Sequence, residues 1–442
     1  MQLSKHIGKA VWSTASRVVT VLMGFALMLP QKMIGPSQWG IYGTAQAILT
    51  SVFMLSDSIA LQAMVNFGVI PERRREALTI SAVTHLLFCT LCAAAVYFGR
   101  GAISSILNEP QLAVTLTYFP LVVLGFLLRT YFLKVSQISI DTRATFYIEV
   151  AWSGTTVLLI AAGWLRHAIV DANDMMVISA ISSGVSSAVG LAFQWRHVRF
   201  TSTINRANAL QMYRLGLAQL GSAVTMVLQT QGDILILKRF ASSAVVGNYD
   251  AAKRFFRGFE ALRDAAVLLI YPAVARLAAE RRREELVKLV EKMIGFMATA
   301  VVPIVLVIWL GPADMLFAWI YKGKYDSAAM IFKVLSLAAL VLPFSMNTYV
   351  LGALSEARQY FRVTFVSAIL AVVAMWIFVP MLGGEGAALG VVVSYLSLAI
   401  LATRSVLRTV PFTITGALGR WRDAFNFVAR TWRSVIQRAG RR

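Results

Sequence analysis

Apolar runs of about 20 residues, separated by short polar stretches, recur along the whole chain. A membrane-spanning α-helix needs about 20 largely apolar residues to cross the hydrocarbon core of a bilayer. The pattern therefore predicts an all-α polytopic membrane protein with twelve transmembrane helices. They cover residues 10–34, 40–66, 78–98, 113–136, 146–166 and 175–195 in the first half, and 215–240, 246–275, 293–310, 329–354, 363–382 and 387–410 in the second.

The positions of the basic residues predict the orientation of these helices. With a cytoplasmic N-terminus, and with most charges toward the helix ends counted with the adjoining loop or tail, 28 of the 42 Lys and Arg residues fall on the inner side, seven in outer loops and seven within spans. On this count Lys134 belongs to the inner side and Lys238 to an outer loop. Basic loops are retained in the cytoplasm, so both termini are predicted to be cytoplasmic. Once the acidic residues are counted on the same boundaries, the inner segments carry +19, whereas the outer loops and the spans carry +1 each.

The overall composition excludes an ordinary soluble protein. The chain has 442 residues, of which 58% are hydrophobic and only 14% charged, with a formal net charge of +21 and a mean hydropathy of +0.69. Soluble globular domains carry about 25% charged residues. Because nearly all of the basic excess lies in the inner segments, it indicates topology and contact with membrane lipids, and no nucleic-acid partner is expected.

A short motif recurs in the two halves of the chain. Three residues that follow the first predicted helix recur after the seventh at an offset of 207 positions: Gly40, Tyr42 and Ala45 match Gly247, Tyr249 and Ala252. Lys32 and Arg239 share this offset. Since each repeat holds an even number of helices, both run in the same direction. The sequence predicts two six-helix lobes, residues 1–205 and 206–410, related by a pseudo-twofold axis along the membrane normal.

The remaining residues, 411–442, form a basic tail with helical periodicity. Apolar residues recur there at spacings of three and four, and arginines occupy other positions: Leu418, Trp421, Phe425, Val428, Trp432 and Val435 make up the apolar set. This pattern is typical of an amphipathic helix on a membrane surface, attracted to anionic lipids.

The eighth predicted helix contains the densest set of charged residues. Five of them follow spacings of three and four and so share one helical face: Asp250, Lys253, Arg257, Glu260 and Asp264. An ionisable residue within a span costs about 2.5–3.5 kcal/mol and so suggests a function. We expect a wall of an aqueous cavity, in which Lys253, Arg254, Arg257 and Arg263 are candidates for binding an anionic headgroup. Glu260 and Asp264 are candidates for ion coupling. Alternatively, the span begins near Phe259, and residues 250–257 are a solvated helix end.

Ionisable residues in four other spans are further candidates. Arg17 and Arg129 suit pyrophosphate, because a guanidinium can donate to two oxygens at once. Asp57 is a candidate for ion coupling or for pairing with one of these cations. Asp233 follows a polar run and is either a coupling site or part of a helix–helix hydrogen bond. His85 is interpreted as a hydrogen-bonded packing residue.

Motifs for catalysis are not found. No Gly-rich phosphate loop, metal-spaced His/Cys set or nucleophile–base grouping occurs. Cys89 and Cys92 lie in an apolar span without an aqueous phase for zinc or thiol chemistry, and are interpreted as small buried side chains. We expect no catalytic residue, cofactor or metal.

Two stretches resemble a known family. The segments GDILILKRFASSAVVGNYDAAKRF, residues 232–255, and TVLMGFALMLPQKMIGPSQWGIYGTAQAI, residues 20–48, are similar to those of bacterial polysaccharide flippases. These form the lipopolysaccharide and exopolysaccharide branch of the multidrug/oligosaccharidyl-lipid/polysaccharide superfamily, and the similarity in layout covers about residues 5–410. The resemblance implies a bacterial inner-membrane protein with a central cavity and alternating access. Its implied substrate is an undecaprenyl-pyrophosphate-linked oligosaccharide, moved from the cytoplasmic to the outer leaflet.

Two alternatives to a flippase remain open at this stage. A multidrug exporter of the same superfamily should line its lobes with acids, whereas the net charge within the spans is +1. An enzyme of polysaccharide assembly should carry a larger extramembrane loop or convergent acids. Docking of a polysaccharide polymerase or another assembly protein is compatible with the basic tail but has no specific motif.

Overall fold

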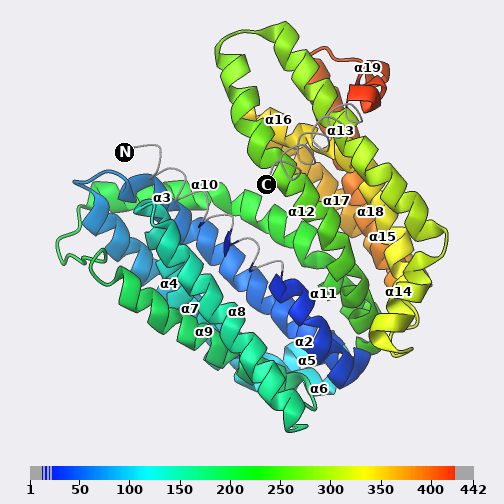
Figure 1. Cartoon of the computed structure of the whole chain (residues 1–442). Coiled ribbons are helices and arrows are strands. Elements are labelled where there is room, and N and C mark those ends of the chain that lie inside the picture. The colour runs from blue at the N-terminus through cyan, green and yellow to red at the C-terminus, as the bar shows by residue number, and fades with distance from the viewer. Residues whose placement is uncertain (1–11, 13–14, 17–18, 20–21, 424–442) are drawn as a thin grey trace, which may run out of the picture. The chain divides into compact units, whose positions relative to one another are not determined.

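Helices make up almost all of the structure. The computed structural model describes residues 12, 15–16, 19 and 22–423, and no strand occurs among them. The chain divides into two compact units, Met1–Asp250 and Ala251–Arg442 (Figure 1). The all-α architecture predicted from the sequence is confirmed. The boundary between the units lies within one helix, and the division into lobes at residues 205 and 206 stays a prediction.

Unit 1 contains the helices up to the start of α12. They are α2 (Met28–Ser56), the π-helical turn η1 (Asp57–Leu61), α3 (Gln62–Gly68), α4 (Arg74–Phe98), α5 (Arg100–Ile106), α6 (Pro110–Thr115), the 3₁₀ turn η2 (Leu116–Tyr118), α7 (Phe119–Ile138), α8 (Thr142–Leu165), α9 (Ala172–Gln194), α10 (Arg206–Thr230) and α11 (Gly232–Phe240).

Unit 2 contains most of α12 (Ser243–Ala279) and the helices that follow it. They are α13 (Arg283–Trp309), α14 (Pro312–Tyr321), α15 (Ala328–Ser345), α16 (Asn347–Ala353), α17 (Ala357–Leu382), α18 (Gly384–Leu407) and α19 (Ile414–Gly419).

The described part of the chain holds nine helices that are long and apolar enough to cross a membrane, or ten if α10 and α11 form one bent span. Two of the twelve predicted spans are not counted among these. The first begins in residues outside the described ranges. The eighth corresponds to α12, which carries charged residues along most of its length. A multi-pass protein is confirmed, whereas the count of twelve stays a prediction.

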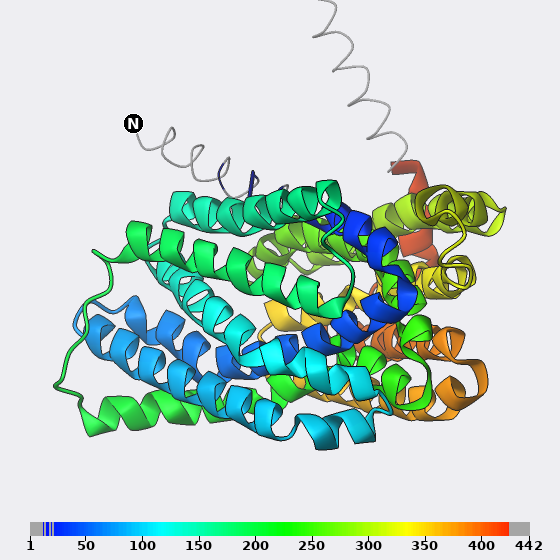
Figure 2. The ribbon, with the colours of Figure 1, turned by 90° about the horizontal axis from the view of Figure 1, so that it is seen from below.

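Small residues allow the helices of unit 1 to pack closely. The helices α4, α7, α8 and α9 run alongside one another (Figures 1 and 2). At Gly125 of α7 an added Cβ would meet Ser183 of α9, and the Ser187 hydroxyl donates to the Gly125 carbonyl at 2.6 Å. Close backbone approach with hydroxyl groups at the contact is the usual way to join helices where no hydrophobic driving force exists between them.

Two predicted spans are interrupted. Gly35 has φ +78°, a conformation that favours glycine, and divides α2 between the first and second predicted helices; Pro36 follows as a suitable first residue of the resumed helix. The seventh predicted span is broken at Gln231, where α10 and α11 meet at 52°. The single helix predicted over residues 215–240 is therefore two helices, and the polar run before Asp233 marks the bend.

The internal repeat reappears as a reciprocal contact within unit 1. A Cβ on Gly40 of α2 would clash with the backbone carbonyl of Ser243, and a Cβ on Gly247 of α12 would clash with that of Pro36. Pro36 and Ser243 are 207 positions apart, as are Gly40 and Gly247. A contact in which each partner meets the equivalent of the other is what a twofold axis produces. The offset found in the sequence therefore corresponds to a pseudo-symmetric helix contact.

Candidate functional site

The charged stripe of the eighth predicted span lies on one uninterrupted helix, α12, of 37 residues. Its first member, Asp250, belongs to unit 1, where its carboxylate accepts a hydrogen bond from the Trp39 indole at 2.7 Å. Asp250 is only 5% exposed. This carboxylate therefore joins α12 to α2 and is not an open cavity group in this structure.

In unit 2, the next part of the stripe forms a polar cluster with α18. The Tyr395 hydroxyl donates to the Glu260 carboxylate at 2.6 Å and lies 3.1 Å from an Arg263 guanidinium nitrogen. Arg263 also pairs with Asp264 at 2.9 Å, and its guanidinium carbon lies 5.9 Å from the ring centre of Tyr349. The structure thus brings together three predicted site residues and adds two tyrosines that the sequence analysis missed.

Arg257 differs from its neighbours on α12. It is exposed, and among the residues that the structure describes no hydrogen bond or ion pair engages its guanidinium. Lys253 and Arg254, half-buried on the preceding turn, lie on the same helix. A guanidinium without a protein partner can present its full set of donors to an anion.

Arg129 is buried in unit 1 and is already paired. Its guanidinium donates to Glu149 of α8 at 2.8 Å and lies 4.7 Å from the Trp152 ring centre and 5.7 Å from that of Phe126. The side chain of Arg129 is 10% exposed and that of Glu149 16%. For Arg129 to bind a headgroup, this pair would first have to open.

The Arg129–Glu149 pair leads to a stability prediction. We expect Arg129→Leu and Glu149→Leu each to destabilise the protein by about 3–5 kcal/mol, because each leaves one buried charge without a partner. The double variant should regain most of that loss. The thermal midpoint of detergent-solubilised protein measures the effect, with Arg276→Ala, on an exposed side chain, as the control. Single variants as stable as the wild type would contradict the prediction.

Asp57 pairs with a residue that the sequence analysis assigned to an inner loop. Its carboxylate lies 2.8 Å from the Lys134 ammonium of α7 and accepts from the Gln62 amide at 2.9 Å. Of the two arginines predicted as alternative partners of Asp57, Arg129 is engaged by Glu149, and Arg17 lies outside the described residues. Asp57 also begins η1, a π-helical turn. Such turns inside α-helices are frequent at functional sites.

His85 is a packing residue, as predicted. It is 1% exposed, and its ring nitrogens lie 2.6 Å from the Ser56 hydroxyl, 3.0 Å from the Thr130 hydroxyl and 3.1 Å from the Leu127 carbonyl. These contacts join α2, α4 and α7.

Asp233 is fully buried at the start of α11, just after the bend. Its carboxylate accepts from its neighbouring Ile234 amide at 2.8 Å and from the hydroxyl of Tyr249 on α12. The predicted helix–helix hydrogen bond is therefore present. Discontinuous helices are typical of ion and substrate sites in transporters, which keeps Asp233 among the candidates.

Two predicted features lie wholly or partly outside the described residues. Arg17 is one of them, and the tail beyond residue 423 is the other. The described start of the tail, α19, packs against α13. There Arg420 pairs with Glu291 of α13 at 2.9 Å.

Several residues that the structure places beside candidate site residues had no signal in the sequence beyond their polarity. Lys134 and Lys238 were counted among loop charges, yet both lie within helices and both are paired with acids: Asp57 binds Lys134, and Glu109 binds Lys238. Tyr395 stands in an apolar span and carries no charge to mark it. Among the described residues, no group of three His, Cys, Asp or Glu side chains is placed to hold a metal ion.

Comparison with known proteins identifies relatives in sequence and in fold. The sequence profile of a family described as "Polysaccharide biosynthesis protein" matches residues 7–260, more than half of the chain. No protein of curated function matches the sequence significantly.

Solved structures of transporters share the fold at low sequence identity. The lipid II flippase MurJ in an inward closed conformation superposes with a TM-score of 0.76 at 12% identity, covering 97% of this chain and 93% of that one. An inward-facing multidrug resistance MATE family transporter of the MOP superfamily gives 0.72 at 15% identity, covering 90% and 98%. A mutant of the Vibrio cholerae MATE transporter VcmN gives 0.60 at 15% identity, covering 91% and 98%. The TM-scores establish a common fold, whereas sequence identities this low leave the substrate open.

Proposed function

The chain belongs to the family of polysaccharide biosynthesis proteins, and from this premise we propose that it is a flippase of the bacterial inner membrane. Its proposed substrate is an undecaprenyl-pyrophosphate-linked oligosaccharide, which it moves from the cytoplasmic to the outer leaflet for surface or exopolysaccharide synthesis. The family and the shared transporter fold support transport over catalysis. The two proposed lobes, residues 1–205 and 206–410, alternate between inward-open and outward-open states.

The observation that carries this proposal is the guanidinium of Arg257 on α12, which is exposed and which no residue in the described part of the chain engages. A pyrophosphate offers several oxygens to a guanidinium, which can donate to two of them in parallel. Lys253 and Arg254 on the same helix add positive charge within one turn. Arg17 and Arg129 are proposed to contact the headgroup from the first half, and Arg263, six residues further along α12, is proposed to support Arg257.

The membrane potential favours the proposed direction of transport. Moving about two negative charges out of a negative cytoplasm is favourable by roughly 4–5 kcal/mol per 100 mV. An ion gradient is then needed mainly to reset the empty carrier. Asp57, Asp233, Glu260 and Asp264 are the proposed coupling residues, and the Glu260–Tyr395 hydrogen bond offers a place where a proton can be held.

The test of this function is a direct measurement of flipping. Purified protein in proteoliposomes is supplied with a fluorescent polyprenyl-pyrophosphate glycan in both leaflets, and the fraction quenched by a membrane-impermeant reductant is followed with time. We expect complete quenching with the protein and about half without it. In cells, deletion of the gene should abolish surface polysaccharide.

The alternative is a multidrug exporter, because one structure that shares this fold is a multidrug resistance MATE family transporter. Unchanged surface polysaccharide together with a gain in drug sensitivity after deletion would support it and overturn the flippase proposal. A polysaccharide polymerase or another assembly protein remains a proposed partner, to be identified by crosslinking in cells.

A further inference from the structure

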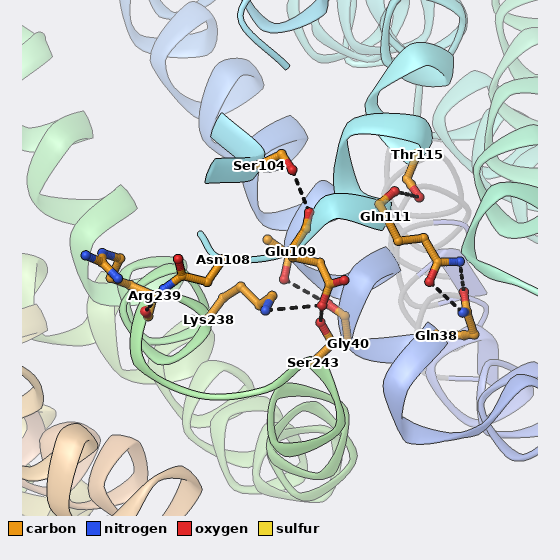
Figure 3. A network of polar contacts seen from close by, with 11 residues as sticks. Gln38, Gly40, Ser104, Asn108, Glu109, Gln111, Thr115, Lys238, Arg239 and Ser243 are labelled. Atoms are coloured by element: carbon orange, nitrogen blue, oxygen red, sulfur yellow. Dashed lines mark hydrogen bonds and ion pairs between the residues drawn. The ribbon is translucent and has the colours of Figure 1, made fainter. Parts of the chain in front are cut away.

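Glu109 connects the two predicted repeat halves on the predicted outer side of the membrane. Its carboxylate lies 3.3 Å from the Lys238 ammonium at the end of α11 and accepts a hydrogen bond from the Ser243 hydroxyl at the start of α12. Figure 3 shows both side chains meeting the same carboxylate. The Glu109 carboxylate, which comes from the first half, thus contacts the end of α11 and the start of α12, both of which belong to the second half.

The turn that carries Glu109 is itself fixed to the first half. The Ser104 hydroxyl donates to the Glu109 carbonyl at 2.7 Å, and the Glu109 amide donates to the Ser104 carbonyl at 3.0 Å. Two residues further on, Gln111 exchanges side-chain hydrogen bonds of 3.0 and 3.2 Å with Gln38 of α2 (Figure 3). The carboxylate is therefore presented from a rigid base.

The ammonium of Lys238 is costly to bury, which makes its partner important. Lys238 is 1% exposed, and a buried charge that loses its partner is strongly destabilised. At the offset of 207 the equivalent position is Gln31, an uncharged residue. The repeat itself does not require a charge at this place, so the Glu109–Lys238 pair is specific to the second half.

The same residue, Ser243, takes part in the glycine contact described above. Its hydroxyl binds Glu109, and its carbonyl packs against Gly40 of α2. The ion pair and the glycine contact are therefore mechanically joined, because the start of α12 cannot leave α2 while Glu109 retains Ser243. Opening one requires breaking the other.

We propose that Glu109 is a latch that keeps the start of α12 against α2 at Gly40, on the predicted outer side, and that its carboxylate must release Lys238 and Ser243 when the transport path opens outward. This inference rests on the proposed function for its role in transport. In the closed state the latch offsets the cost of the buried ammonium. In the open state Lys238 and Glu109 separate and regain water.

The test measures outward opening at Gly43, one helical turn from Gly40. Gly43 is buried, yet a Cβ there meets no heavy atom within 4 Å, so Gly43→Cys is sterically tolerated. In a Cys89→Ala/Cys92→Ala background, intact cells are labelled with a membrane-impermeant maleimide. We expect slow labelling of the latched protein and at least fivefold faster labelling after Glu109→Gln or Lys238→Met.

The exchange Glu109→Lys/Lys238→Glu restores the ion pair in reverse and should return labelling toward the slow rate. A matched control is Asp314→Asn, which breaks the Lys333–Asp314 pair in unit 2 and should leave labelling unchanged. The thermal midpoint of each solubilised variant identifies any variant that fails to fold. If Lys238→Met does not fold, the comparison of Glu109→Gln with the exchange variant still tests the latch.

Equal labelling rates in the wild type, Glu109→Gln and the exchange variant would overturn the latch. Labelling needs no oligosaccharide, so the result stands even if the flipping assay shows a different transported solute. Conversely, normal flipping with unchanged labelling would reject the latch and leave the proposed function intact.

Discussion

Replacing Arg257 with alanine is expected to lower the rate of oligosaccharide flipping at least tenfold. Hydrogen bonds to charged groups contribute about 1.5–3 kcal/mol, and each 1.4 kcal/mol is a factor of about ten. Since the guanidinium of Arg257 is exposed on α12 and no described residue engages it, its loss should weaken headgroup binding without leaving a buried charge unpaired. The proteoliposome assay measures the rate, and the thermal midpoint should stay unchanged.

Two further variants distinguish recognition of the headgroup by the guanidinium of Arg257 from an effect of positive charge alone. Arg257→Lys keeps the positive charge but loses the planar fork that binds two oxygens, so an intermediate rate is expected. Arg276→Ala removes an exposed arginine from the far end of the same helix and should flip at the wild-type rate. If Arg257→Ala flips as fast as Arg276→Ala, Arg257 does not bind the headgroup, and the observation that carries the proposed function is lost.

The variants Gly40→Val and Gly247→Val are expected to disrupt the α2–α12 contact to the same extent. In each case the new side chain meets a backbone carbonyl, of Ser243 or of Pro36, and backbone cannot move aside as a flexible side chain can. Overpacking costs about 1–3 kcal/mol and occasionally more, and rigid neighbours place these sites at the upper end. We expect a lower thermal midpoint and faster maleimide labelling of the Gly43→Cys variant.

The reciprocal geometry adds a sharper expectation for the double variant. Because both substitutions break one contact, their effects should not add, in contrast to those of independent sites. Gly154→Val is the matched control, since a Cβ at this helical glycine of α8 meets nothing within 4 Å. Strictly additive effects, or a large effect at only one of the two glycines, would show that they do not share a contact.

The positions of most helices followed from the sequence, but their interruptions did not. The run 78–98 coincides with the apolar part of α4, and 363–382 lies within α17. The bend at Gln231 was missed, whereas α12 begins at Ser243, within a few residues of the predicted start. The length of an apolar run indicates whether a segment can cross a membrane, but it does not report a change in helix direction within that run.

The candidate site was found in part, because the sequence marks charges but does not identify their partners. Glu260, Arg263 and Asp264 were placed on one helix correctly, and the structure adds Tyr395 from α18. Arg129 was a candidate for an open cavity, yet Glu149 neutralises it. Periodicity relates residues a few positions apart, whereas these pairs join different helices.

The sequence alone determined that this protein is an all-α multi-pass membrane protein with a repeated motif, because apolar run length and residue spacing are properties of the chain read in one dimension. Only the tertiary structure decided which charged side chains form ion pairs with one another and which are left to bind a ligand. Asp57–Lys134, Arg129–Glu149 and Glu109–Lys238 each form between separate helices or turns. A buried charge must find a partner in space, and the fold selects that partner.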